Sequence, residues 1–261
     1  MNKTDQQKLK RARPFYYKRG KIGLLLVHGF TGTPYIFYEL GQALASQGYT
    51  VSAPLLAGHG LKPTNLEQTT WDDWYVSVEA AYRKMTKDCD QIFIVGASVG
   101  GALACYLVAK QKLPALKGLI LIGVPRWLYR QWLIMIGTPI YVILRIRYFT
   151  KPFSKQLNET VIFGGPNFSY LKIPIKSVVE LMRGLAGLDG QLLRKIKVPT
   201  LIIQSSRDGL VKPQSGTFLF KSLGTDEKEL VWITEQHHEL HVGKGRHQIY
   251  SLITDFIVRW I

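Results

Sequence analysis

The sequence predicts an α/β fold in which a mostly parallel central sheet carries helices on both faces. Apolar runs without polar alternation, at residues 21–30, 91–96 and 198–204, are typical of strands buried on both faces of a parallel sheet. Segments with helical spacing separate such runs, for example 71–87 and 98–110. Strands that alternate with helices at this spacing form βαβ units with right-handed crossovers.

The order of the expected elements divides the chain into a core, a tail and an insertion. The strands are expected at 21–30, 49–56, 91–96, 116–124, 198–204 and 228–234, and the helices at 36–48, 71–87, 98–110, 175–187 and 246–261. The alternation stops between 124 and 197. For a chain of 261 residues this pattern predicts one domain. Its parts are a basic N-terminal tail at 1–21, a core at 22–124 and 196–261, and an inserted cap at 125–195.

The net charge of +16 is concentrated in two segments. Residues 1–21 carry eight Lys and Arg against one acid, and residues 124–195 carry eleven against three. The rest of the chain is nearly balanced, with fifteen against fourteen. A nucleic-acid-binding protein would carry its basic residues on the core elements, so no nucleic acid partner is expected. A basic tail and cap favour weak association with an anionic membrane surface, or simply solubility.

Cysteine usage and the N-terminus indicate a cytoplasmic protein. Cys89 and Cys105 cannot form a disulfide framework and are expected to be free thiols in a reducing compartment. The start of the chain is basic but has no apolar run of the kind found in signal peptides. The oligomeric state is left open.

The expected cap contains an uncharged apolar run at 132–144. It is too short to span a bilayer and is interrupted by Gly137 and Pro139. One interpretation is a cap element that buries its apolar face on the core. A second, compatible one is a lid that meets a lipid-like substrate, with cationic side chains near an anionic surface. These cations are Arg126, Arg130, Arg145 and Arg147.

The most specific motif is a G-x-S-x-G sequence between an expected strand and an expected helix. It comprises Gly96, Ser98 and Gly100, and Gly101 follows. A nucleophile elbow requires this arrangement, because the chain must turn sharply and place a serine in a strained conformation at the carboxyl end of the sheet. Ser98 is therefore the candidate nucleophile.

A serine needs a base, and the base needs an acid to orient it. Asp208 is the candidate acid, because it comes just after the strand at 198–204 and so lies at the same sheet edge as Ser98. Asp189 lies in the expected cap, Asp226 precedes a strand at the opposite edge, and Asp255 belongs to the last helix. The base is then expected in the loop after strand 228–234. The resulting chain order of Ser, Asp and His is that of α/β-hydrolases.

That loop reads EQHHELH, at 235–241, and contains His237, His238 and His241. Zinc-binding histidines on a helix need i, i+4 spacing to face one ion, whereas His238 and His241 are three apart and follow a strand. We therefore expect no metal, and each of the three histidines remains a candidate base.

Backbone N–H groups of Phe30 and Val99 are the candidate oxyanion donors. Phe30 follows His28 and Gly29 directly after the first buried strand, and Val99 begins the helix after Ser98. Such donors stabilise the charge that develops in acyl transfer.

The sequence resembles compact bacterial carboxylesterases of the α/β-hydrolase fold, and this family pattern extends to monoacylglycerol-lipase-like enzymes. The resemblance rests on LLLVHGFTGTP (24–34), APLLAGHG (53–60), WDDWYVSV (71–78), GASVGG (96–101) and SSRDGLVKP (205–213). It covers roughly 22–124 and 196–261, is weak across the expected cap and absent from the tail. It implies a triad of Ser98, Asp208 and one histidine, with Phe30 and Val99 as oxyanion donors and no cofactor.

Alignment with the Ser-x-His that the family commonly carries near its final loop selects His238 as the base, with Gln236 in place of the usual serine. The G-H-G turn of the family contains His59, for which a structural role is expected.

These features together predict a serine carboxylesterase that hydrolyses small-molecule esters through an acyl-enzyme. An acyl site for aliphatic or lipid-like chains is expected in the apolar cap, at Trp127, Trp132, Met135 and Ile136. The alternatives are a monoacylglycerol lipase or lysophospholipase with the same triad. A remoter one is a non-catalytic binding protein on this fold, which usually lacks a triad residue.

Overall fold

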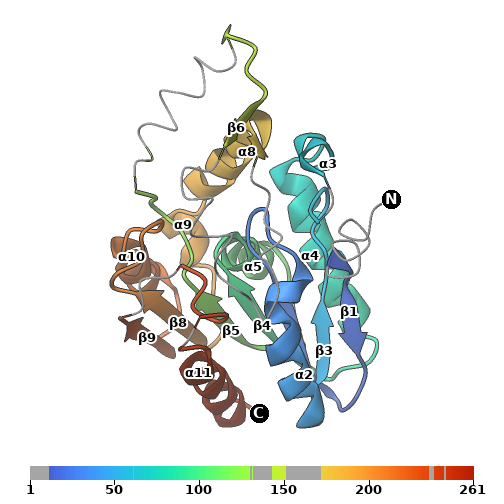
Figure 1. Ribbon diagram of the computed structural model, residues 1–261. Coiled ribbons are helices and arrows are strands. Elements are labelled where there is room, and N and C mark those ends of the chain that lie inside the picture. The colour runs from blue at the N-terminus through green and yellow to red at the C-terminus, as the bar shows by residue number, and fades with distance from the viewer. Residues whose placement is uncertain are drawn as a thin grey trace.

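A seven-stranded sheet forms the centre of the molecule in the computed structural model (Figure 1). The structure describes residues 12–60, 62–129, 131, 143–150, 172–234, 238–243 and 245–261. The strand order is β1-β3-β2-β4-β5-β8-β9, and every neighbouring pair is parallel except β1 with β3. The strands are β1 (Phe15–Tyr17), β2 (Ile22–Val27), β3 (Thr50–Ala53), β4 (Gln91–Ala97), β5 (Leu116–Ile122), β8 (Thr200–Ser205) and β9 (Lys228–Ile233). The predicted mostly parallel sheet is confirmed.

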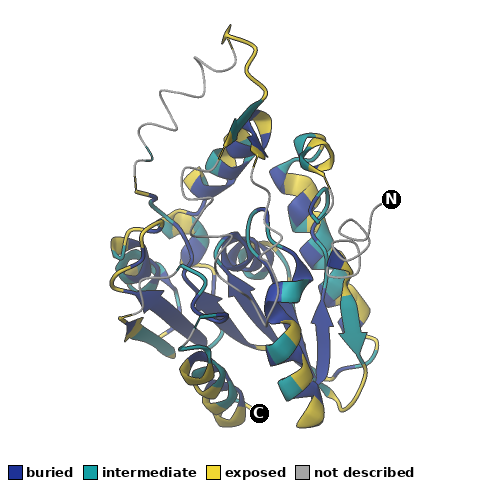
Figure 2. Cartoon of the chain, in the orientation of Figure 1, coloured by how far each residue is buried: buried dark blue, intermediate teal, exposed yellow. Residues whose placement is uncertain are grey.

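Helices cover both faces of this sheet and enclose two apolar cores. One core joins the sheet to α4, α5 and α10, and the other joins it to α2 and α11. The bounds are α2 (Tyr38–Ser46), α4 (Trp71–Met85), α5 (Val99–Lys110), α10 (Gln214–Ser222) and α11 (Arg246–Arg259). In β2, Leu25 and Val27 face the first core, whereas Leu24 and Leu26 face the second. Because both faces of the strand are buried, its sequence shows no alternation of apolar and polar residues. Figure 2 shows the central strands buried along their length.

Helix starts follow the local signals in the sequence. Thr70 caps α4: its hydroxyl accepts from the Asp73 N–H, and the Asp73 carboxylate accepts from the Thr70 N–H in return. Such a capping box satisfies two N–H groups that the helix itself leaves unpaired. The expected helix at 36–48 is present as α2, and a short 3-10 helix, η1 (Pro34–Phe37), leads into it.

Strand β1 lies within the expected tail and was not predicted. It is three residues long and flanked by basic residues, so periodicity alone does not reveal it. It pairs antiparallel with β3, and the Asp88 carboxylate anchors it by accepting from the Tyr16 hydroxyl at 2.6 Å and the Lys18 ammonium at 2.5 Å. Three helices were also not predicted: α3 (Pro63–Glu67), α9 (Gly190–Leu193) and α10.

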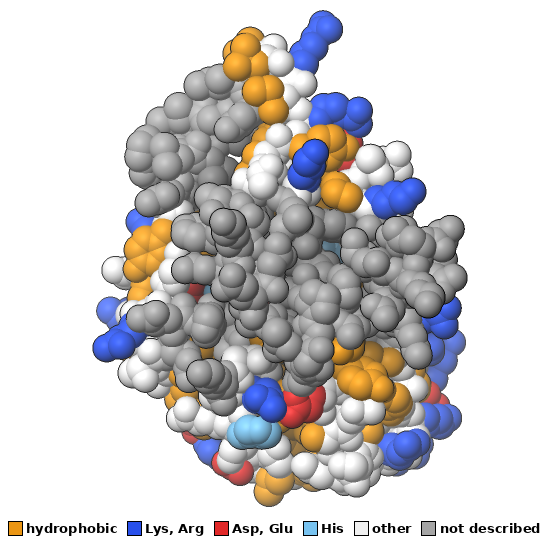
Figure 3. Space-filling model, in the orientation of Figure 1, with side chains coloured by type: hydrophobic (Ala, Val, Ile, Leu, Met, Phe, Trp, Pro, Cys, Tyr) orange, Lys and Arg blue, Asp and Glu red, His pale blue; other side chains and the backbone are white. Residues whose placement is uncertain are grey.

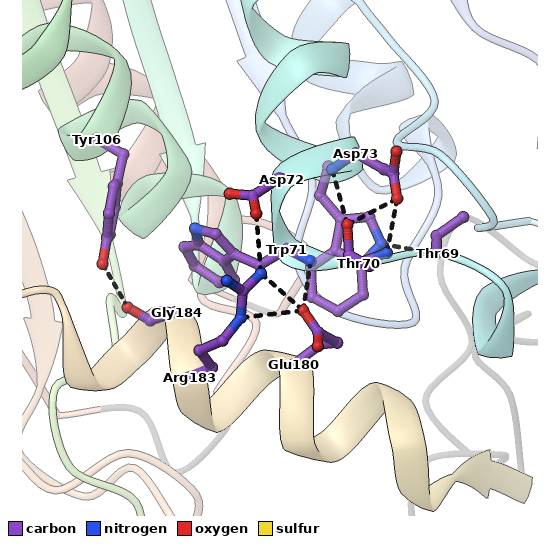
Figure 4. Close-up of polar contacts among 10 residues, drawn as sticks. Thr69, Thr70, Trp71, Asp72, Asp73, Tyr106, Glu180, Arg183 and Gly184 are labelled. Carbon is purple, nitrogen blue, oxygen red and sulfur yellow. Dashed lines mark hydrogen bonds and ion pairs between the residues drawn. The ribbon is translucent and has the colours of Figure 1, made fainter.

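In the expected cap, the described residues 143–150 and 172–195 contain a strand pair and two helices. Strands β6 (Tyr148–Thr150) and β7 (Lys172–Pro174) are antiparallel, and α8 (Ile175–Ala186) and α9 follow. Helix α8 crosses the N-terminus of α4 (Figure 4). There the Glu180 carboxylate accepts from the Trp71 N–H at 3.1 Å, and Arg183 donates to Asp72 at 3.0 Å and to Glu180 at 2.9 Å. Glu180 therefore accepts from a further N–H of the first turn of α4, which the capping box of Thr70 and Asp73 does not satisfy.

Apolar packing fixes α8 at the same place. A side chain at Gly184 would overlap the Trp71 indole ring, so the two elements are in direct contact. The Tyr106 hydroxyl donates to the Gly184 carbonyl at 2.8 Å (Figure 4). Strand β6 has its own link, because Glu67 accepts from Arg147 at 2.8 Å and from the Tyr148 hydroxyl at 3.0 Å. This part of the cap segment is thus attached to α3, α4 and α5.

The apolar run at 132–144 lies outside the described residues except for its last two positions. These two, Ile143 and Leu144, are 78% and 63% exposed, so this end of the run does not pack on the core. Within the described ranges, no helix has the length and apolar character needed to cross a membrane. Both cysteines, Cys89 and Cys105, are free and buried.

Three histidines are buried in the fold and held neutral. Burial, together with the neighbouring His59, lowers the pKa of His28 to about 3, and burial lowers that of His59 to about 4. Burial and the nearby His238 lower the pKa of His241 to about 3. The His241 ring stacks on Phe37 at 4.6 Å between centroids, and neither ring nitrogen has a hydrogen-bond partner in the described structure.

These histidines make stability depend on pH below neutrality. Above about pH 6.5 they are neutral in both states and contribute nothing. At lower pH these histidines take up protons in the unfolded chain, whereas in the folded chain they stay neutral down to about pH 3 to 4. The free energy of unfolding therefore falls as the pH falls. For each histidine the loss in the free energy of unfolding at about pH 5.5 is about 1.4 kcal/mol.

Substitution of His241 tests this dependence. We expect His241→Phe to remove the part of the loss that His241 contributes, measured by urea unfolding at about pH 7.5 and 5.5. The exposed control His247→Gln should leave the difference between the two pH values unchanged, and a His241→Phe variant that behaved like the wild type would contradict the assignment.

Candidate active site

Ser98 occupies a strained turn between β4 and α5. Its φ of 52° and ψ of −122° lie in a region that few non-glycine residues adopt. The Ser98 N–H donates to the Ile122 carbonyl of the neighbouring strand β5 at 2.7 Å, which holds the turn at the carboxyl end of the sheet. The predicted elbow geometry is therefore present.

Glycines make this turn sterically possible. A side chain at Gly96 would overlap the backbone of Gly101, and one at Gly100 would overlap the Val27 carbonyl of β2. A side chain at Gly101 would overlap Val124. Helix α5 thus begins in contact with the strands, as the G-x-S-x-G sequence predicts.

Asp208 lies three residues beyond β8, and its side chain is fully buried. One carboxylate oxygen, Oδ1, accepts from the backbone N–H groups of Leu210 at 2.7 Å and Val211 at 2.9 Å. Burial alone would raise the pKa of this carboxyl. The hydrogen bond and charge interaction with His238 and the two backbone donors outweigh burial, so the pKa lies below its usual value. Asp208 is therefore an anion with one oxygen left for His238.

His238 joins the other two residues. Its Nδ1–H donates to Asp208 Oδ2 at 2.7 Å, and its Nε2 accepts from the Ser98 hydroxyl at 2.9 Å. An ionised carboxylate at Nδ1 selects the tautomer that leaves Nε2 free to accept a proton. Gly123 lies next to the ring, since a side chain there would be in van der Waals contact with His238 Cε1 at 3.4 Å, and its φ of 57° is a conformation that favours glycine. Residues that are 140 positions apart in the chain thus meet at one sheet edge.

The other two histidines of the 235–241 stretch do not share this position. His241 is buried against Phe37, and its ring nitrogens form no hydrogen bond with Ser98 or Asp208. His237 and Gln236 lie outside the described residues. Among the three candidates, the structure therefore brings His238 to Ser98 and Asp208.

The expected oxyanion donors lie beside Ser98. A side chain at Gly29 would be 3.1 Å from Ser98 Cβ and 3.6 Å from Ser98 Oγ, so the backbone that leads into Phe30 passes next to the serine. Val99 is the first residue of α5, where backbone N–H groups have no partner within the helix. Neither the Phe30 N–H nor the Val99 N–H has an acceptor among the described residues.

His28 fixes the peptide that carries the Phe30 N–H. The His28 Nδ1–H donates to the Gly29 carbonyl at 2.9 Å, and Nε2 accepts from the Leu56 N–H at 3.1 Å. The Gly32 N–H also donates to the Gly29 carbonyl, at 3.1 Å. The Gly29 carbonyl and the Phe30 N–H belong to one planar peptide unit, so holding the first orients the second. No local sequence pattern indicates this role of His28, because it depends on the contact with Leu56 in a different loop.

The loop that contains Asp208 is tied to the start of the expected cap. Leu128 and Val211 form an antiparallel bridge, and the Tyr129 N–H donates to the Leu210 carbonyl at 2.9 Å. The buried Ser215 hydroxyl accepts from the Trp127 N–H at 3.1 Å. These contacts hold the two backbone N–H groups that bind Asp208. No local sequence signal indicates them, because they join segments more than eighty residues apart.

Only one of the four residues expected in the acyl site is described. Trp127 packs edge-on against Phe218 at 5.2 Å, and the Arg126 guanidinium lies 5.5 Å from its ring centroid. Trp132, Met135 and Ile136 lie outside the described residues. The ring of Phe30 packs on the buried Trp74 at 5.5 Å between centroids.

Comparisons with known proteins identify the family of this chain. Residues 20–244 match the family described as serine aminopeptidase, S33. A thermostable monoacylglycerol lipase from Bacillus sp. (strain H-257) is 35% identical over 248 residues, which cover 95% of each chain. A carboxylesterase from Bacillus subtilis (strain 168) is 26% identical over 246 residues, or 94% of this chain and 96% of that protein.

A solved structure of a metagenome-derived lipolytic enzyme is also similar. It has a TM-score of 0.81 and 28% identity, and the alignment covers 96% of this chain and 99% of that one. The predicted resemblance and the α/β-hydrolase fold are thus confirmed. The chain belongs to the serine aminopeptidase S33 family, as an α/β-hydrolase similar to bacterial lipases and esterases.

Proposed function

We propose that this protein is a serine carboxylic ester hydrolase that acts on aliphatic or lipid-like esters, with Ser98, His238 and Asp208 as its triad. The observation that carries the proposal is the continuous hydrogen-bonded chain from Ser98 Oγ through the His238 ring to Asp208. A non-catalytic protein would have no need for a strained serine joined to a base and a buried acid. We propose Phe30 and Val99 as the oxyanion donors.

In the acylation step, Ser98 Oγ attacks the ester carbonyl carbon while His238 Nε2 takes the hydroxyl proton. Asp208 stabilises the imidazolium that forms and holds its ring in place. The carbonyl oxygen becomes an oxyanion that accepts from the Phe30 and Val99 N–H groups. His238 then gives its proton to the ester oxygen of the leaving alcohol, the C–O bond breaks, and an acyl-Ser98 ester remains.

Deacylation repeats these steps with water. His238 Nε2 removes a proton from a water molecule as its oxygen attacks the acyl carbon, and the same two N–H groups stabilise the second oxyanion. Collapse breaks the bond to Ser98 Oγ, which takes the proton back from His238, and the carboxylic acid leaves. Each proton is thus moved by one imidazole, and the sequence of steps uses no cofactor.

Monoacylglycerol is a second candidate substrate class within the same chemistry. It is favoured by the similarity to the Bacillus monoacylglycerol lipase, which at 35% identity exceeds the 26% found with the Bacillus carboxylesterase. Both candidates use the same triad and differ only in the alcohol that leaves. Lysophospholipid is the third ester to test, because it also carries one acyl chain.

Substitutions in the triad test the mechanism. We expect Ser98→Ala and His238→Ala each to lower kcat on p-nitrophenyl butyrate by about 10⁴-fold or more, because neither residue works alone. Asp208→Asn should cost about 10⁴-fold, because the amide can favour the wrong tautomer of His238. Initial rates measure the loss, and unchanged circular dichroism shows that each variant is folded.

The buried His241 is the matched control for His238. We expect His241→Phe to keep at least about a tenth of the wild-type kcat, since its ring contacts Phe37 rather than Ser98. Full activity in Ser98→Ala, or loss of activity in His241→Phe with retention in His238→Ala, would refute the assignment.

Substitution of His28 tests the orientation of the oxyanion peptide. We expect His28→Phe to lower kcat about 10- to 100-fold with little change in KM, because the Phe30 N–H acts mainly in the transition state. His28→Asn should recover part of this loss, since its amide can donate to the Gly29 carbonyl in place of Nδ1–H. A purely structural role would lower the folded fraction of His28→Phe without this separation of kcat from KM.

A substrate series tests the acyl preference. We expect kcat/KM on p-nitrophenyl esters to rise from acetate to medium chains by about fourfold per buried methylene. Monoacylglycerols and lysophosphatidylcholine with the same acyl chain should then separate the alcohol preference. A maximum at acetate with a steady decline would show that no extended acyl site exists.

A further inference from the structure

A short segment, residues 127–129, lies antiparallel to the loop that holds Asp208, and we call this segment the brace. The Tyr129 N–H donates to the Leu210 carbonyl at 2.9 Å. The Leu210 carbonyl and the Val211 N–H belong to one planar peptide unit, so a bond that fixes the first also orients the second. That N–H donates to Asp208 Oδ1 at 2.9 Å. The brace thus acts on the acid through a single peptide.

The hydroxyl of Ser215 holds the other end of the brace. It accepts from the Trp127 N–H at 3.1 Å and donates to the Trp127 carbonyl at 3.3 Å. The same carbonyl also accepts from the Lys212 N–H at 3.0 Å. Because Ser215 is fully buried, bulk water does not compete for these bonds. One hydroxyl therefore binds both polar backbone groups of the residue that begins the brace.

Close packing of α10 on the sheet places this hydroxyl. A side chain at Gly216 would lie 2.9 Å from Gln204 Cγ of β8, so the first turn of α10 lies directly against the strand that precedes the acid loop. On its outer side α10 carries the exposed Gln214 and Lys221, and Figure 3 shows Lys and Arg side chains on the surface at this side of the molecule. Ser215 lies on the inner side of the helix, where it contacts the brace.

The chain of contacts that begins at Ser215 ends at the base. Two backbone N–H groups occupy Asp208 Oδ1, whereas Oδ2 accepts from the His238 Nδ1–H at 2.7 Å. A carboxylate is planar and rigid, so the donors at Oδ1 set the direction in which Oδ2 points. A rotation of the carboxylate would lengthen the bond to His238 and release the ring from the position in which Nε2 faces Ser98. A misorientation of about 10–20° is enough to disturb such a site.

We propose that Ser215 is a positioning residue of the active site: through the brace it fixes the backbone donors of Asp208, and so it keeps His238 directed at Ser98. This inference rests on the proposed function, because it assigns Ser215 a part in the same triad. The competing role is that the hydroxyl only satisfies the buried backbone of Trp127, as partners of buried polar groups commonly do. The first role predicts impaired catalysis in a folded variant, and the second predicts lower stability alone.

Two substitutions separate the hydroxyl from the volume that it fills. We expect Ser215→Ala to lower kcat on p-nitrophenyl butyrate about 5- to 50-fold and to change KM less than about twofold, because the acid acts on the imidazolium of the transition state. Ser215→Cys should show the same loss, since a thiol fills similar space but is a weak donor and acceptor. Wild-type kcat in either variant would overturn the proposal.

Ser177→Ala is the matched control. It removes an equally buried hydroxyl, which donates to the Leu66 carbonyl at 3.1 Å and lies on α8. We expect this variant to lose stability in urea unfolding, as Ser215→Ala does, but to keep the wild-type kcat. An equal loss of kcat in the two variants would show that the effect is not specific to the acid loop, and the proposal would fail.

A double-mutant cycle tests whether Ser215 acts through the acid. In the Asp208→Asn background the carboxylate is absent, so we expect Ser215→Ala to lower the remaining kcat by less than about twofold. A general structural defect would instead multiply the two losses. The same fold-loss with and without the carboxylate would therefore contradict the proposal.

Tyr129→Pro tests the brace from its other end and leaves Ser215 unchanged. Proline lacks the N–H that donates to the Leu210 carbonyl. Tyr129→Ala loses the same side chain, which is 44% exposed, but keeps this N–H, so the two variants are compared with each other. We expect kcat to be about 5- to 50-fold lower in Tyr129→Pro than in Tyr129→Ala. Equal kcat values would mean that the brace does not position the acid.

The Nδ1 proton of His238 gives a measurement that needs no catalysis. A proton that a ring nitrogen donates to a carboxylate at 2.7 Å gives a far-downfield ¹H NMR signal, which His238→Ala should remove. We expect this proton to exchange with solvent at least about fivefold faster in Ser215→Ala than in the wild type or Ser177→Ala. An unchanged exchange rate would overturn the proposal. Full activity in Ser98→Ala would instead refute the proposed function, while the proton would still report on the brace.

Discussion

The close approach of helix α5 to strands β2 and β4 is the constraint on which the site depends. A single methyl group at Gly96 or Gly100 would overlap backbone atoms, so these positions must lack side chains. The approach forces Ser98 into its strained conformation and brings it against the backbone at Gly29. The strain persists because the surrounding sheet determines the turn from several sides, including the hydrogen bond from Ser98 to Ile122. The position of Ser98 and its proximity to the backbone at Gly29 are thus consequences of one packing contact.

Histidines in this protein differ in function because their surroundings differ. His28 is fully buried and neutral, and it connects two loops, because its Nδ1–H donates to the Gly29 carbonyl and its Nε2 accepts from the Leu56 N–H. His238 is partly exposed and contacts an anion, which suits a ring that must gain and lose a proton. His241 has neither a carboxylate partner nor access to solvent, and its contact with Phe37 is that of an aromatic core residue. One residue type thus takes three roles within a small region.

The core strands, the elbow and the acid loop could be predicted from the sequence because each has a local pattern. The run 91–96, followed by Gly96-x-Ser98, defines a strand and a turn within a few residues, and the position of Asp208 after a buried strand defines its sheet edge. The choice of His238 came from the family resemblance, because spacing alone left three histidines open. Strand β1 and the bonds of Trp127 to the acid loop could not be predicted. They depend on pairings between distant segments and on short elements without periodicity.

The division of the site between two halves of the chain has a consequence for biosynthesis. The elbow is made by residues before 124, whereas the acid and the base follow β8 and β9, and β9 pairs only with β8 among the described strands. During translation the elbow segment leaves the ribosome first, and its serine is then an ordinary alcohol without a base. Under the proposed mechanism, Ser98 becomes reactive only when the last strand joins the sheet edge and brings His238 to it. The proposal therefore implies that a nascent chain that lacks β9 has no hydrolytic activity.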